Sequence, residues 1–185
     1  MNIGIIVAVV VVVLIILWVV LSYNNFIKKK NNVEEAFSTM DVYLKQRHDL
    51  IPNLVETVKG YAAHEKETLQ GVIEARNAAE KAANVDDKVA CENLVEKGLG
   101  RLFAIAENYP DLKANTNFVE LQHSLQSLEM DIANARKYYN ATVKSFNNRV
   151  EVFPSNILAG IFHFSKMSMF EVNDEAEREN VEVQF

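Results

Sequence analysis

The sequence predicts an all-α protein, with one N-terminal transmembrane helix followed by an antiparallel bundle of three long helices and a short C-terminal helix. Three observations predict this class. An apolar segment runs unbroken from Ile3 to Leu21, and apolar residues recur at spacings of three and four through most of the remainder. No stretch alternates polar and apolar residues for long enough to predict a strand.

The apolar segment predicts a retained membrane anchor, residues 1–30. Nineteen residues from Ile3 to Leu21 give a helix of ~28 Å, close to the ~30 Å hydrocarbon thickness of a bilayer. Trp18 and Tyr23 fall near its far end, where amphipathic rings prefer the headgroup region. A cleaved signal peptide is disfavoured, because the segment lacks a charged start and a small-residue cleavage site.

The first charged residues are three adjacent lysines, Lys28, Lys29 and Lys30. Positive flanks stay in the cytoplasm, so they predict a single-pass protein of the cell membrane with its N-terminus outside and its body cytoplasmic. They are also candidate lipid-facing residues. Without them 19 − 3 = 16 positive charges face 25 negative ones, and so acidic a body excludes a nucleic-acid binder.

The body, residues 31–170, has three long amphipathic stretches. The first runs from Val33 to Ala82, with an expected kink at Pro52, where Asp49 would cap the free amides. Residues 84–87 are predicted to turn the chain and cap a second helix, which ends near Pro110. The third is predicted to begin at cap residues 115–117, with Asn117 and Glu120 as a capping box, and to close at Pro154.

Two segments follow the third stretch. Ser155 opens a short apolar helix that could cap the bundle or rest on a membrane, and residues 171–185 form an acidic tail. Gly98 and Gly100, in the second helix, are either loose spots or points of close helix approach. Cys91 is expected to be a small buried hydrophobe.

Arg47 is the unusual residue of the buried stripe, because it lies in the same register as Leu44 and Ile51. A charge in this position needs a partner, such as Asp49, Glu56 or a carboxylate on another helix. One interpretation is a bridged charge that fixes helix register at the kink. The other is a partner-binding or gating site; the candidate residues for either are Arg47, His48, Asp49, Pro52 and Asn53.

No pattern predicts catalysis, a metal site or a cofactor. Only Glu120 and His123 have the spacing of a di-iron motif, and both are expected to point away from the apolar face of their helix. Phosphate loops, dinucleotide fingerprints and nucleophile elbows are absent from the sequence.

Several segments resemble one known family. The longest reads DVYLKQRHDLIPNLVETVKGY from Asp41 to Tyr61; the others are Glu74-Ala75-Arg76, YPDLKAN from Tyr109, ARKYYN from Ala135, and Phe153-Pro154-Ser155. This set resembles the LemA family over nearly the whole chain. The resemblance implies a bacterial or archaeal membrane protein with one N-terminal span and a helical cytoplasmic body. It also implies a relative in the machinery that builds magnetosome membranes. Genes of family members often lie beside genes of membrane metallopeptidases. The resemblance assigns no catalytic activity.

The sequence therefore favours a non-enzymatic, membrane-tethered helical scaffold that self-associates or contacts other membrane proteins. The expected partners are the lipid bilayer, a second copy of the chain and possible membrane partners such as a metallopeptidase. Two alternatives remain open: an adaptor or regulator of a membrane peptidase that docks through its acidic face, and a metal-dependent or hydrolytic enzyme.

Overall fold

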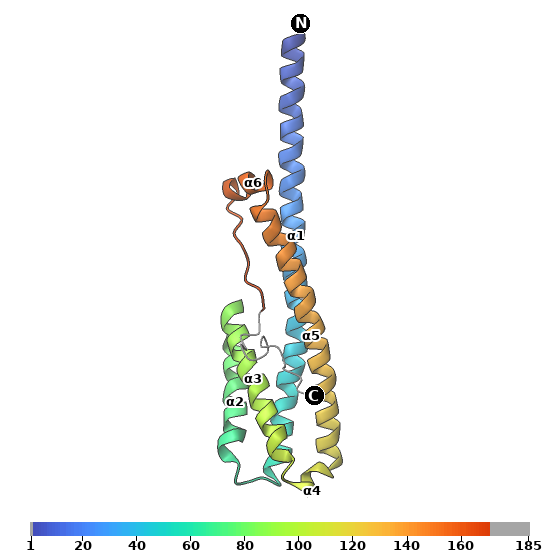
Figure 1. The fold of residues 1–185 in the computed structure, drawn as a ribbon, viewed down its shortest axis with the longest axis vertical. Helices are drawn as coiled ribbons and strands as arrows, with labels where there is room; N and C mark the ends of the chain where they lie inside the picture. The colour runs from blue at the N-terminus through green and yellow to red at the C-terminus, as the bar shows by residue number, and fades with distance from the viewer. Residues whose placement is uncertain (1, 171–185) are drawn as a thin grey trace, which may run out of the picture. The chain divides into compact units, whose positions relative to one another are not determined.

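The computed structural model describes residues 2–170 and is all-α in that range, as predicted. The predicted acidic tail, residues 171–185, lies outside the described residues. The helices are α1 (Ile3–Lys59), α2 (Lys66–Lys81), α3 (Val85–Ala106), α4 (Pro110–Lys113), α5 (Thr116–Glu151) and α6 (Ser155–Ile161), drawn in Figure 1. Their described residues form two compact units, unit 1 of residues 2–44 and 130–169 and unit 2 of residues 45–129 and 170.

Helix α1 is continuous over 57 residues, from the apolar segment into the body. Apolar side chains between Ile3 and Leu21 are almost all exposed. By length and composition, α1 is one candidate membrane span among the described residues. No helix boundary separates the predicted anchor from the body, so the backbone leaves the apolar segment without a linker.

The predicted first stretch, Val33 to Ala82, is wrong as a single element. Helix α1 passes through Pro52 and ends at Lys59, and α2 begins only at Lys66. Gly60 favours an end here, because glycine is among the poorest helix formers. Buried Val58 and Ala62 maintain the apolar spacing across the turn, which is why the sequence pattern shows no break. Tyr61, which stands three residues after Val58, is exposed.

The starts of the later helices follow their capping chemistry. Asn84 caps α3, its side chain accepting a hydrogen bond from the Asp87 amide at 2.8 Å, as the sequence predicts. Asn115, rather than the expected pair Asn117 and Glu120, serves the first turn of α5, because its Oδ1 accepts from the Phe118 amide at 3.0 Å. The short α4 is an element that the sequence analysis did not predict.

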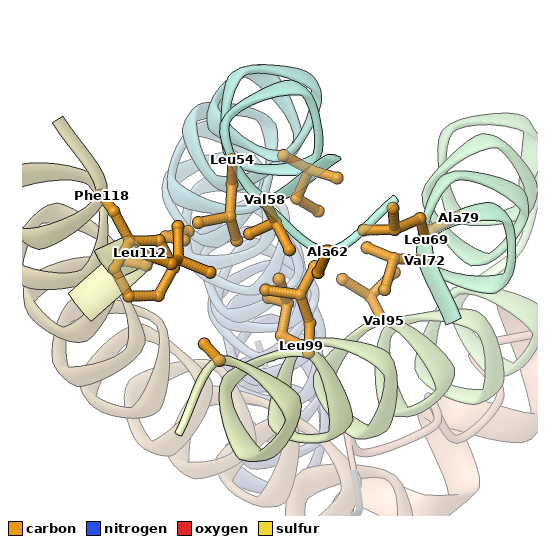
Figure 2. Packing of buried hydrophobic residues seen from close by; sticks show 14 residues of the cluster. Leu54, Val58, Ala62, Leu69, Val72, Ala79, Val95, Leu99, Leu112 and Phe118 are labelled. Atoms are coloured by element: carbon orange, nitrogen blue, oxygen red, sulfur yellow. The ribbon is translucent and has the colours of Figure 1, made fainter. Parts of the chain in front are cut away.

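Unit 2 has a mainly aliphatic core, with Phe118 among its members, contributed by all its helices (Figure 2). Leu54 and Val58 of α1 lie with Val72 of α2, Val95 and Leu99 of α3, all at most 4% exposed. Gly98 is a close-approach point: a Cβ there would lie 3.2 Å from Cγ2 of Val72, whereas one at Gly100 would meet open space. The absence of a side chain at Gly98 thus lets α2 and α3 pack closely.

In unit 1, α1 and α5 run antiparallel. Three contacts show this: Ser22 with Arg149, Lys29 with Ser145, and Phe37 with Tyr139. Residue numbers rise along α1 while those of their partners on α5 fall. Aromatic rings fill the space between them: Phe26 stacks on Phe164 with centroids 4.6 Å apart and meets Phe146 edge-on at 6.3 Å. The antiparallel arrangement agrees with the predicted bundle.

Candidate functional site

Arg47 lies at the centre of a buried ion cluster in unit 2. Its side chain is fully buried, and its two terminal nitrogens bind carboxylates from two other helices. Nη2 lies 2.5 Å from Oε2 of Glu92 on α3, and Nη1 lies 2.6 Å from Oε1 of Glu129 on α5. The sequence predicts a carboxylate partner on another helix, and the structure has two, Glu92 and Glu129. Arg47 Nε is buried without a hydrogen-bond partner among the described residues.

His48 completes the cluster from the same helix as Arg47. Its Nε2 lies 3.1 Å from Oε1 and 3.2 Å from Oε2 of Glu92, so the ring faces the whole carboxylate. Both side chains are buried. Oε2 of Glu92 accepts the hydrogen bond from Arg47 and lies within hydrogen-bond distance of His48, whereas Oε1 is buried without a hydrogen-bond partner among the described residues.

The electrostatics of the cluster favour the charged forms of Arg47 and Glu92. Burial by itself raises the pKa of Glu92, but the hydrogen bond from His48 and the charge of Arg47 outweigh it, so the pKa falls below its ordinary value of 4.5. Burial likewise lowers the pKa of Arg47, and the charges of Glu129 and Glu92 more than reverse this effect. The buried pair is an arginine and a carboxylate that both stay ionised.

Arg76 of α2 explains how α1 accommodates Pro52. A proline has no amide hydrogen, so the carbonyl four residues earlier, that of His48, lacks its helical donor. Arg76 Nε donates to this carbonyl oxygen at 2.9 Å. Its outer nitrogens bind Glu80 of the same helix. A side chain from α2 therefore replaces the missing backbone donor, and α1 continues to Lys59.

The remaining candidates near Pro52 do not join the cluster. Asp49, Pro52 and Asn53 are exposed. Asp49 lies inside α1, so its expected role as a cap at Pro52 is wrong. Neither Asp49 nor Glu56 is the partner of Arg47, and Glu56 instead pairs with Lys59 at 3.3 Å.

The three lysines lie in unit 1, within about one turn after Phe26. Lys28 and Lys30 are exposed, and Lys30 pairs with Glu34 at 3.7 Å. Lys29 is half-buried and donates to Ser145 Oγ at 2.6 Å. At least one of the three therefore has a structural contact in addition to any role in topology or lipid binding.

Sequence reasoning did not single out Glu92 or Glu129. A signal for Glu92 exists, because it occupies the same stripe as Val89, Val95 and Leu99, spaced by three and four. A lone carboxylate in an apolar stripe requires a buried cation. Glu129 stands four residues after Leu125 and three before Ile132, and it is only half-buried, so its signal is weaker.

Other reactive side chains are placed as expected or nearly so. Glu120 and His123 are exposed, as predicted. Cys91 is half-buried against the core of unit 2, so it is less enclosed than expected. The buried cluster joins three helices of unit 2, because Arg47 and His48 of α1 meet Glu92 of α3 and Arg47 also meets Glu129 of α5.

Comparison with known proteins assigns the chain to a family. A family model described as LemA matches residues 36–185. Protein LemA of Metamycoplasma hominis is 26% identical over 86% of this chain and 73% of its own length. Magnetosome proteins MamQ 2 of Paramagnetospirillum magneticum and MamQ of Magnetospirillum gryphiswaldense are 25% and 24% identical, over 82% and 81% of this chain. The match covers 65% of each MamQ protein. The chain belongs to the LemA family.

Proposed function

We propose that this chain is a non-enzymatic single-pass membrane protein that holds a helical body at the cytoplasmic face and pairs there with a second copy of itself. One observation carries the proposal: α1 is continuous from the exposed apolar segment into the body, where it supplies Arg47 to the ion cluster. The same helix that anchors the chain therefore also organises the body.

The orientation follows from the charges beside the apolar segment. Lys28 and Lys30 are exposed and follow the apolar segment by about two to three helical turns. Positive residues near the end of a span remain in the cytoplasm. Each lysine near an anionic leaflet contributes about 1 kcal/mol of attraction. The proposal accordingly has the N-terminus outside and the body inside the cell.

A groove between α2 and α3 supplies a surface for self-association. It has a volume of about 480 Å³ and lies entirely within unit 2. Small residues line it, among them Gly71, Ala75 and Ala78, and a Cβ at Gly71 would meet open space. Leu94 adjoins them with 55% of its surface exposed. Small residues beside an exposed leucine give another helix room to approach closely.

The charges around this groove are self-complementary. Glu67 and Glu74 line it from α2, whereas Lys97 and Arg101 line it from α3, and all four are exposed. A two-fold axis would set the acidic side of one copy against the basic side of the other, since a two-fold interface uses the same patch on both subunits. Such pairing favours a second copy over a partner with one sign of charge.

Charge reversal at the groove tests the proposal. Glu74→Lys and Arg101→Glu are each expected to reduce dimers in chemically crosslinked native membranes, because each sets like charges opposite one another. The double variant, which exchanges the two charges, is expected to restore dimers. Glu120→Lys, at an exposed position of α5 outside the groove, is the matched control and is expected to leave dimers unchanged.

A strictly monomeric chain, or single variants that crosslink as the natural chain does, would contradict the pairing. The adaptor alternative makes a different prediction: a membrane peptidase co-purifies with the natural chain, and charge reversal on the acidic face of α5, as in Glu120→Lys, abolishes its capture. Accumulation of product from any tested hydrolytic substrate would contradict the non-enzymatic part of the proposal.

A further inference from the structure

Helix α6 and its flanks expose an unusual concentration of large apolar side chains. We define them as the α6 patch: Val152, Phe153, Ile157, Ile161 and Phe162, which are 58%, 74%, 52%, 62% and 41% exposed. They fall within eleven consecutive residues of unit 1. Exposed apolar residues scattered singly are ordinary, but a concentration of this kind indicates an interaction surface.

The opposite side of α6 is packed, so the patch is the outer face of a fixed element. Ser155, Leu158 and Ala159 are buried. Ser155 Oγ lies 2.8 Å from the carbonyl oxygens of Arg149 and Val152 at the end of α5. Helix α6 is therefore amphipathic, with one face held against the protein and the other presented outward.

The patch lies beside the point where the apolar segment of α1 ends. The Phe162 ring packs on Tyr23 with centroids 4.8 Å apart, and Phe164 contacts both Tyr23 and Phe26. Arg149 Nη2 donates to Ser22 Oγ at 3.0 Å. Figure 1 shows α6 next to α1 at this level. Residues 22–26 of α1, immediately after Leu21, thus define the height of the patch along the helix.

That height corresponds to the headgroup region if Ile3–Leu21 crosses the hydrocarbon. Five residues at ~1.5 Å rise extend only about 7 Å beyond the apolar segment. An amphipathic helix in this region buries its apolar face about 5–10 Å into the boundary between headgroups and acyl chains. Exposed Lys28 and Lys30 follow within two turns of Tyr23, where cations meet anionic headgroups.

We infer that the α6 patch inserts into the interfacial region of the same bilayer leaflet from which the apolar segment of α1 emerges, as a second membrane contact of the chain. The inference rests on the membrane anchoring in the proposed function. The patch contacts the phospholipid surface. It is apolar, it adjoins the end of the candidate span, and cations lie nearby. Two contacts, one spanning and one interfacial, would fix the rotation of α1 about its axis.

Tryptophan fluorescence in vesicles tests this directly, because the chain has one tryptophan, Trp18. In a Trp18→Phe background, Ile161→Trp and Ile157→Trp each place a single probe in the patch at an already exposed position. Met130→Trp, on α5 of the same unit at a residue 63% exposed, is the matched control. Full-length chains are reconstituted in phosphatidylcholine–phosphatidylglycerol vesicles that contain brominated acyl chains.

Blue-shifted emission and several-fold stronger bromine quenching at positions 157 and 161 than at position 130 are the expected results. The natural chain, in which Trp18 reports on the span, separates the two proposals. Quenched Trp18 with patch probes no more quenched than the control overturns the second contact and leaves the anchor. Blue-shifted but unquenched patch probes overturn it as well, since protein would then cover the patch. Unquenched Trp18 overturns both.

Discussion

The two units hold the same long helices, α1 and α5, by different chemistry. In unit 1 the contacts are aromatic rings and hydrogen bonds to the returning chain. Phe26 packs between Phe146 and Phe164, and Asn147 exchanges two hydrogen bonds of 2.9 Å with the backbone of Met167. In unit 2 an aliphatic core surrounds a buried cluster of charges centred on Arg47.

The difference shows how each kind of contact suits its neighbourhood. Each phenylalanine ring buries a large apolar area, so a few rings pack α1 against α5 and the returning chain in unit 1. A buried arginine stabilises only an arrangement that provides its carboxylates, and it penalises every register that does not. We therefore expect unit 2 to be stricter in helix register than unit 1, whose contacts depend on packed area.

The largest expected effect comes from removing the cation of unit 2. Arg47→Ala should lower the free energy of unfolding by about 3–5 kcal/mol, because it leaves the Glu92 carboxylate buried without its main counter-charge. Chemical denaturation of the full chain in detergent micelles, followed by circular dichroism, measures this loss. Arg47→Met combined with Glu92→Leu removes both charges and should cost clearly less. Equal losses would show that the charge itself is unimportant.

Removing the central ring of unit 1 is expected to cost about 3 kcal/mol, as for other buried phenylalanines. Phe26→Ala deletes the contacts with Phe146 and Phe164. Amide hydrogen exchange should therefore increase in residues 155–169 and remain unchanged in α3. An increase in α3 of similar size would contradict the assignment of these contacts to separate units.

Arg76 gives a smaller effect that depends on Pro52. Arg76→Ala should cost about 1–3 kcal/mol, because the buried carbonyl of His48 loses its donor. In a Pro52→Ala background the restored backbone amide can donate to this carbonyl, so the same substitution should cost about 1 kcal/mol less. Unfolding free energies of the four chains in this double-mutant cycle provide the test. If Arg76→Ala costs the same free energy in both backgrounds, Arg76 does not replace the backbone amide donor that Pro52 lacks.

The smallest effect is a change in pH dependence. The lowered pKa of Glu92 means that its ionised form stabilises the folded chain above the ordinary value of 4.5, and this contribution disappears as the pH falls through the lowered value. The stability difference between the natural chain and Glu92→Gln should therefore be full at neutral pH and narrow below about 4.5. The exposed Glu120→Gln serves as the control. If the stability difference between the natural chain and Glu92→Gln stays constant between neutral pH and pH 3, the pKa shift is contradicted.

Much of the fold was predictable because it depends on local pattern. The third amphipathic stretch, predicted to begin at residues 115–117 and to close at Pro154, is α5, and Asn84 correctly marked the start of α3. The break after Lys59 was missed, because Val58 and Ala62 keep helical spacing across a turn. Its position depends on where α2 packs, which periodicity does not report.

The candidate site was predictable only in part. Arg47 stood out as a charge in an apolar stripe, and the need for a partner followed from the cost of an unpaired buried charge. The partners themselves are 45 and 82 residues away in sequence. Several carboxylates on other helices satisfied the same requirement, so the choice among them was open.

By itself the sequence determined a membrane-length apolar segment, its lysine flank, the helical class and the presence of one buried cation. All four depend on composition and on spacing within a single helix. Tertiary structure alone decided that Glu92 and Glu129 meet Arg47, that Arg76 serves the carbonyl freed by Pro52, and that α6 lies beside the end of the apolar segment. These contacts join residues far apart in the chain, and only packing brings them within hydrogen-bond or van der Waals distance.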